Sequence, residues 1–141
     1  MVKFIKLMPA FLFFISVGTE SRGVSHVEIY KTGIPYEGRR TEALIRDCAV
    51  FKPTKEQIIH FFNVAKKYEE SVGLLHDFYS PCISTGSVTF KDGLSGTWVL
   101  QSSGLASFFI DGEKKATFFT RNNKWDDPFG CVYGADDASS C

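Results

Sequence analysis

The sequence predicts an α+β domain in which one long amphipathic helix packs on an antiparallel meander of about four to six strands, stapled by disulfides. Three observations lead to this fold class. Apolar residues recur with a helical period within residues 53–73, and they alternate with polar residues between glycine turns in residues 86–123. Four cysteines follow an apolar N-terminal segment.

The N-terminus has the layout of a secretory signal peptide. Two lysines precede an apolar run from Leu7 to Val17, which is too short to cross a bilayer of about 30 Å as a helix. The small residues that follow predict cleavage after residue 18, give or take a few positions. The alternative is a buried N-terminal helix. We therefore expect residues 1–18 to be removed and the protein to be exported, with no stable membrane anchor.

The remaining residues, 19–141, are predicted to form a single domain with a C-terminal tail from about residue 134. Removal of the leader leaves 14 basic residues against 16 acidic ones, a formal charge of −2. Such a surface offers no electrostatic attraction to nucleic acid. The chain also lacks an Asn-x-Ser/Thr site, which favours a bacterial periplasm over a eukaryotic secretory route.

The four cysteines are Cys48, Cys82, Cys131 and Cys141. An even number in an exported chain favours two disulfides, and three pairings are possible. We expect Cys48–Cys82, which would tie together the two ends of the helical region, and Cys131–Cys141, which would close a short terminal loop. A zinc site is the alternative, but the spacings contain no Cys-x-x-Cys pair.

The first half of the domain contains two candidate strands and one predicted helix. Residues 24–32 alternate in the manner of a strand, and the glycines and charges of residues 33–42 predict a loop. Residues 43–51 fit a strand or a short helix, and their β-branched and aromatic end favours the strand. The helix is predicted over residues 53–73, where Thr54 and Gln57 form a capping box. Its apolar stripe comprises Ile58, Phe61, Phe62, Ala65, Tyr68 and Val72.

The second half is predicted to be a meander of four short strands. Asp92-Gly93, Ser102-Ser103-Gly104 and Asp111-Gly112 are the turn sequences between them. Successive side chains of a strand point to opposite faces. Large apolar residues occupy neighbouring positions in three of these strands, so both sheet faces carry apolar groups. The neighbouring pairs are Trp98 with Val99, Phe109 with Ile110, and Phe118 with Phe119. Three explanations remain open: the N-terminal segment covers the second face, the sheet curls around a small core, or an aromatic patch is left for a partner.

Catalytic motifs are missing from the sequence, so no catalytic residue, metal or cofactor is assigned. The chain has no Gly-x-Ser-x-Gly or glycine-rich phosphate loop. His26 with Glu28 could ligate a metal only weakly, and the aspartates of residues 125–141 lack the spacing of an EF-hand loop. A small hydrolase acting on cell-wall or carbohydrate material would have to use His26, His60 or His76 with a nearby carboxylate.

By elimination, the sequence favours a binding function. The leading hypothesis is a periplasmic or secreted inhibitor or immunity-type protein that neutralises a secreted enzyme or toxin. The alternatives are an accessory subunit of an envelope complex and the small hydrolase. Trp125 lies among polar residues and is expected near the surface. The candidate contacts with a protein partner are Asp92, Gly93, Ser102, Ser103, Trp125, Asp126 and Asp127.

Overall fold

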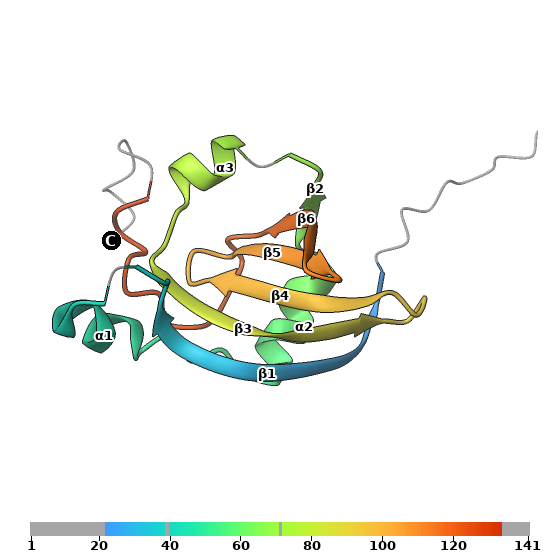
Figure 1. Ribbon diagram of the computed structural model, residues 1–141, viewed down its shortest axis with the longest axis horizontal. Helices are drawn as coiled ribbons and strands as arrows, with labels where there is room; N and C mark the ends of the chain where they lie inside the picture. Colours follow the sequence, from blue (N-terminus) through green and yellow to red (C-terminus); the bar gives the residue numbers. More distant parts are fainter. Residues whose placement is uncertain (1–21, 39, 71, 134–141) are drawn as a thin grey trace, which may run out of the picture.

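A six-stranded antiparallel sheet forms the body of the computed structural model, which describes residues 22–38, 40–70 and 72–133 (Figure 1). The strand order is β1-β3-β4-β5-β6-β2, and α2 lies behind the sheet in this view. The strands are β1 (Val24–Pro35), β2 (Lys66–Tyr68), β3 (Cys82–Phe90), β4 (Ser95–Gln101), β5 (Leu105–Ile110) and β6 (Glu113–Phe119). The helices are α1 (Glu42–Cys48), α2 (Lys55–Val64) and α3 (Val72–Asp77).

The predicted meander is confirmed. Strands β3 to β6 follow one another as antiparallel hairpins. Gly93 and Gly104 adopt φ values of 87° and 91° in the first two turns, and Asp111 and Gly112 adopt 51° and 78° in the third. Two successive residues with positive φ are the requirement of a type I′ turn, which is why an Asp-Gly pair is found there.

Helix α2 starts where the sequence predicts. The Thr54 hydroxyl accepts a hydrogen bond from the Gln57 backbone, and the Gln57 side chain accepts one from the Thr54 backbone, which completes the capping box. Ile58, Phe61 and Phe62 are buried against the sheet. The first half of the predicted apolar stripe is therefore correct.

The length of this helix was predicted wrongly. The helix ends at Val64, because Ala65 has an extended backbone with ψ of 137° and the next three residues form β2. Lys66 pairs with Phe119, and Tyr68 pairs with Thr117, at the outer edge of β6. Pairing with that open edge satisfies the backbone groups as well as a helix would, and it terminates the sheet in a short, lysine-bearing strand. Tyr68 thus belongs to β2, and a separate helix, α3, starts at Val72.

The segment before α2 also differs from the prediction. Residues 43–51 contain the short helix α1 rather than a strand, because Thr41 caps it by accepting a hydrogen bond from the Leu44 backbone. Strand β1 continues through the predicted loop to Pro35, with register shifts that let it bend. Gly33, at φ of 62°, makes this bend possible next to the backbone carbonyls of Cys48 and Phe51.

The predicted disulfide between Cys48 and Cys82 is present and fully buried. It joins the end of α1 to the first residue of β3, across 34 residues of sequence. Cys131 is also disulfide-bonded. Cys141, the predicted leader and the predicted tail from about residue 134 lie outside the described residues.

The sheet curls around α2, which agrees with one of the three explanations for its two apolar faces. The Phe62 ring on α2 lies 6.0 Å from Phe90 on β3, 6.2 Å from Trp98 on β4 and 5.4 Å from Phe118 on β6, measured between centroids. One helical side chain therefore contacts three strands of the sheet. Strand β1 forms an edge of this sheet instead of covering its second face.

Candidate functional site

One side of the sheet is turned away from α2, and we call the solvent-accessible part of that side over β3, β4 and β5 the outer face. Cross-strand pairing aligns its side chains in rows, such as Thr85–Val99–Ser107 and Ser87–Thr97–Phe109. Every one of these six side chains retains some exposure to solvent. The outer face comprises Thr85, Ser87, Thr89, Ser95, Thr97, Val99, Ser107 and Phe109.

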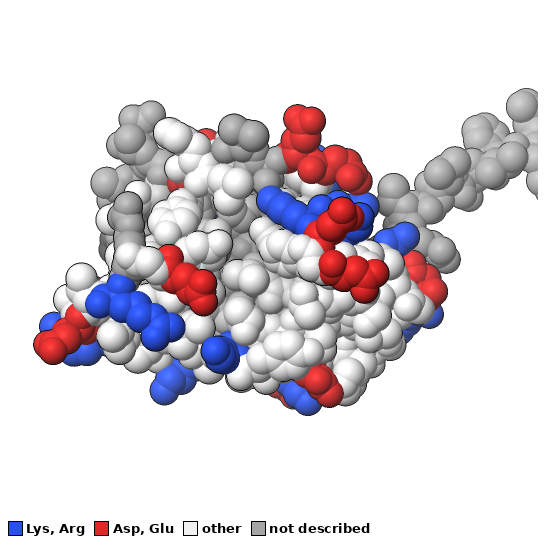
Figure 2. Space-filling view, in the orientation of Figure 1, with Lys and Arg blue, Asp and Glu red and all other residues white. Residues whose placement is uncertain are grey.

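The outer face is uncharged and is enclosed by charged residues. Figure 2 shows an expanse without charge over β3, β4 and β5, with acidic and basic side chains gathered at the β3–β4 and β5–β6 turns and along β1. Arg22 and Asp92 form an ion pair of 2.7 Å beside the β3–β4 turn. A shallow hollow of about 380 Å³ opens at one side of this expanse. Its lining is Ser87, Ser95, Gly96, Thr97, Phe109, Ile110, Asp111 and Gly112.

Beyond the outer face, the same side of the sheet is covered by the chain itself. The Phe78 ring, which follows α3, lies 4.8 Å from the ring of Phe119. The Ser80 backbone donates a hydrogen bond to the Gln101 side chain at 2.8 Å, which fixes the α3–β3 linker over the strands. Leu105 and Ile83 are buried underneath. The outer face is therefore the part of this side that the described chain leaves open.

The predicted partner contacts differ in their exposure to solvent. Asp92 and Gly93 are exposed in the β3–β4 turn, and Asp126 is also exposed. The side chains of Ser102 and Ser103 are buried, which makes them unavailable for contact with a partner. Asp127 is half-buried.

The expectation that Trp125 lies near the surface was wrong. Only 9% of the residue is exposed, and its ring packs edge-on against Phe51, with centroids 5.7 Å apart. Its indole N–H donates a hydrogen bond of 2.8 Å to the Ser102 carbonyl. The polar neighbours in the sequence remain in solvent while the ring turns into the core, so local composition misled the prediction.

A buried polar network holds the segment after Trp125 against the sheet. The Ser102 hydroxyl donates a hydrogen bond of 2.7 Å to Asp127 and lies 2.6 Å from the Ser80 hydroxyl. The Tyr133 hydroxyl donates to the same Asp127 oxygen at 3.1 Å. Burial raises the pKa of Tyr133 to about 12, although its hydrogen bond with Ser102 acts in the opposite direction. These hydrogen bonds hold the segment after Trp125 against the sheet, because each polar group has a partner within the network.

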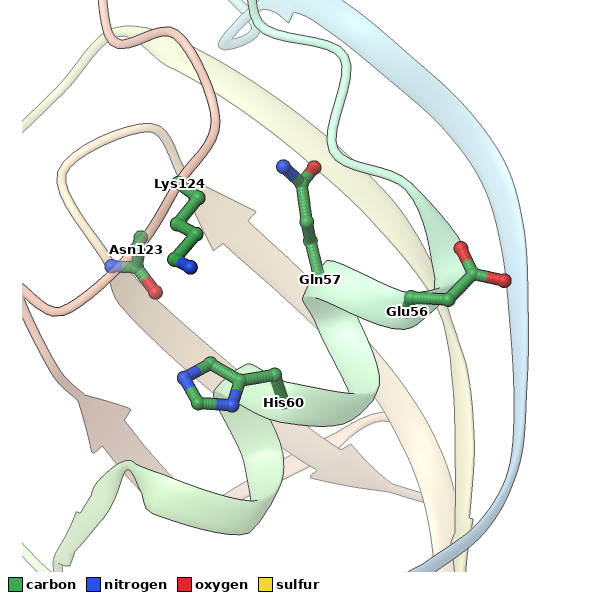
Figure 3. Close-up of a pocket in the computed structure, with 5 residues that line it drawn as sticks. All are labelled: Glu56, Gln57, His60, Asn123 and Lys124. Carbon is green, nitrogen blue, oxygen red and sulfur yellow. The ribbon is translucent and has the colours of Figure 1, made fainter.

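The three histidines lie in different places. His26 and Glu28 lie 3.4 Å apart in a pair that is more than half exposed, and His76 lies 2.9 Å from the carboxylate of Asp77 on the surface. His60 lines a pocket beside α2 (Figure 3). Within residues 22–38, 40–70 and 72–133, no cluster of three or more histidine, cysteine, aspartate or glutamate residues could hold a metal ion.

Sequence reasoning did not identify the outer face, although a signal for it exists. Hydroxyl residues alternate at positions 85, 87 and 89 of β3 and again at positions 95 and 97 of β4. That period of two places them on one side of the sheet. The predicted turn between β3 and β4 fixes the register that places the hydroxyl residues of the two strands side by side. The alternating hydroxyls and the position of the turn, taken together, would have indicated a hydroxyl-rich face.

The Cys48–Cys82 disulfide indicates a non-reducing compartment. Among the helices of the described segments, none has the length and apolar character needed to cross a membrane. Comparisons with protein-family models, with curated proteins and with solved structures find no match to this chain.

Proposed function

We propose that this protein is a small exported binding protein of the inhibitor or immunity type, and that the outer face holds its protein partner. The observation that carries the proposal is the uncharged outer face within a charged surround. Protein interfaces commonly have a core depleted of charge and a polar rim. Val99 and Phe109 would supply the apolar contacts of the core, and the neighbouring hydroxyls would supply hydrogen bonds.

The rigidity of this surface supports a binding role. Its three strands, β3, β4 and β5, are joined by tight turns, and β3 is also tied to α1 by the buried disulfide. A surface that is ordered before binding loses less conformational entropy when the partner docks. The exposed Asp92-Gly93 turn borders the outer face and would contact the partner at its rim.

Introduction of a charge on this face provides a test. Thr97→Arg and Ser107→Arg would each place a cation within the proposed interface, whereas Lys52→Glu changes an exposed charge outside it. We expect the unaltered protein to capture one partner from an envelope extract and to inhibit it after purification. Both arginine variants should lose capture while Lys52→Glu retains it. Equal capture by all four proteins would contradict the assignment of the outer face.

A second candidate, an accessory subunit of an envelope complex, is supported by the same half-buried Val99 and Phe109. The two candidates differ in what docking does to the partner. An inhibitor lowers the activity of its partner in proportion to occupancy, whereas an accessory subunit remains in a stable assembly whose activity is kept or raised. Activity measurements on the purified complex separate them.

A further inference from the structure

Two of the hairpin turns contain the dipeptide Asp-Gly, and the structure places their reactive groups in different surroundings. Asp92-Gly93 lies between β3 and β4, and Asp111-Gly112 lies between β5 and β6. An aspartate side chain reacts most readily with the backbone nitrogen that follows it when the next residue is glycine, because glycine has no side chain to hinder the approach. All four residues are exposed to solvent.

The β3–β4 turn holds both of its reactive groups. One carboxylate oxygen of Asp92 accepts a hydrogen bond of 3.0 Å from the Leu94 backbone, and the other lies 2.7 Å from Nε of Arg22. The Gly93 backbone N–H donates a hydrogen bond of 2.9 Å to the Phe90 carbonyl. A reaction between the Asp92 carboxyl group and the Gly93 nitrogen must therefore break these contacts before it can begin.

The corresponding groups of the β5–β6 turn are free. Within the part of the chain that the structure describes, the Asp111 carboxylate makes no hydrogen bond or ion pair, and the Gly112 backbone N–H has no acceptor. Asp111 also has a φ of 51°, a region that is unfavourable for a residue with a Cβ atom. Rotation out of this conformation relieves the crowding, so the fold does not oppose the reaction here.

We propose that Asp111-Gly112 is a site of spontaneous isomerisation and that the fold protects Asp92-Gly93 from the same reaction. The Gly112 nitrogen forms a bond to the side-chain carboxyl carbon of Asp111, and the carboxyl hydroxyl leaves as water with the amide proton, which gives a cyclic succinimide. Water then adds to the main-chain carbonyl carbon of Asp111, and the bond from that carbon to the Gly112 nitrogen breaks. The product is isoaspartate, in which the main chain runs through the aspartate side chain and the composition is unchanged.

Isoaspartate lengthens the main chain of this turn by one methylene group. The turn consists of Asp111 and Gly112 between the paired residues Ile110 and Glu113, and a turn this short fixes the register of its strands, so the added group must change their geometry. Asp111 and Gly112 also line the shallow hollow beside the outer face, together with Phe109. Isomerisation therefore reshapes one side of the outer face, and this change can be measured without knowledge of any partner.

Ageing of the folded, disulfide-bonded protein at mildly acidic pH tests the proposal. Peptide mapping with electron-transfer fragmentation distinguishes isoaspartate from aspartate at each position. We expect isoaspartate to accumulate about tenfold faster at position 111 than at position 92, because only the β3–β4 turn must first break hydrogen bonds. The same protein unfolded in urea is the control, since the two Asp-Gly sequences should react at similar rates once the fold is lost.

Asp111→Glu is the matched variant, because it keeps the charge while its longer side chain closes the ring far less readily. NMR spectra of the aged protein should show shifted amide signals at Phe109, Ile110 and Glu113, and the aged Asp111→Glu variant should not. Equal rates at the two positions of the folded protein, a faster rate at position 92, or no isoaspartate at position 111 would overturn the proposal. Unshifted signals in protein that carries isoaspartate would overturn the change of shape.

Discussion

The indole N–H of Trp125 donates a hydrogen bond to the backbone carbonyl of Ser102, at 2.8 Å, and this contact joins the C-terminal segment to the β4–β5 turn. The same ring packs against Phe51 and lies 6.0 Å from Phe61 on α2. Trp125 therefore links three parts of the chain that are distant in sequence.

Replacement of Trp125 by alanine should lower the free energy of unfolding by about 3–5 kcal/mol, because the ring leaves a cavity in the core. Trp125→Phe keeps an aromatic ring and loses the indole donor together with part of the ring volume, so its cost should be smaller. Urea unfolding, followed by circular dichroism, measures both changes. A loss below about 1 kcal/mol for Trp125→Ala would show that the ring is not part of the core.

Phe62→Ala should destabilise the protein to a similar extent, by about 3–5 kcal/mol. Phe62 is 4% exposed and contacts rings on three strands, so its removal weakens the attachment of α2 to the sheet. Val64→Ala is the control, since Val64 is 46% exposed at the end of the same helix. The two variants should differ clearly in their urea midpoints. Equal midpoints would mean that the buried side of α2 has been placed wrongly.

The double variant Cys48→Ala/Cys82→Ala should lose about 4 kcal/mol of stability, from the loop entropy of the 34-residue separation. Unfolding of the two proteins in urea without reductant gives this difference. As an independent check, thiol labelling of the denatured, unreduced protein should detect no reactive cysteine. Two labelled cysteines per chain would show that one disulfide does not form.

Ionisation of Tyr133 should destabilise the protein at high pH. Burial raises the pKa of Tyr133 from 10.0 to about 12, so the folded state favours the protonated hydroxyl. That stabilisation is complete below pH 10 and is lost as the pH rises toward 12, because the unfolded chain ionises first. Unfolding measured between pH 9 and about 12 should show a steeper decline for the unaltered protein than for Tyr133→Phe. Parallel declines would contradict the shifted pKa.

Much of the fold could be predicted because its signals are local. The capping box fixed the start of α2, the Asp-Gly pairs located two hairpin turns, and the cysteine positions led to the Cys48–Cys82 pairing. The cap and the turns depend on residues that are close in sequence. The disulfide had to be chosen from only three possible pairings of the four cysteines.

The features that were missed depend on contacts between distant residues. Helix α2 stops at Val64 because residues 66–68 pair with β6, about fifty residues later in the chain, and nothing local marks that stop. The burial of Trp125 likewise depends on Ser102 and Phe51. The outer face required the register of three strands, which the turns imply only after they are combined with the alternating hydroxyl pattern.

Position-resolved photocrosslinking tests the binding role of the outer face most directly. A photoreactive residue at Thr97 would lie at the centre of the proposed interface, and one at Lys52 would lie outside it. We predict that the probe at position 97 crosslinks one protein partner in an envelope extract, that Ser107→Arg abolishes this product, and that the probe at position 52 gives none. A partner captured equally at both positions, or only at position 52, would contradict the account.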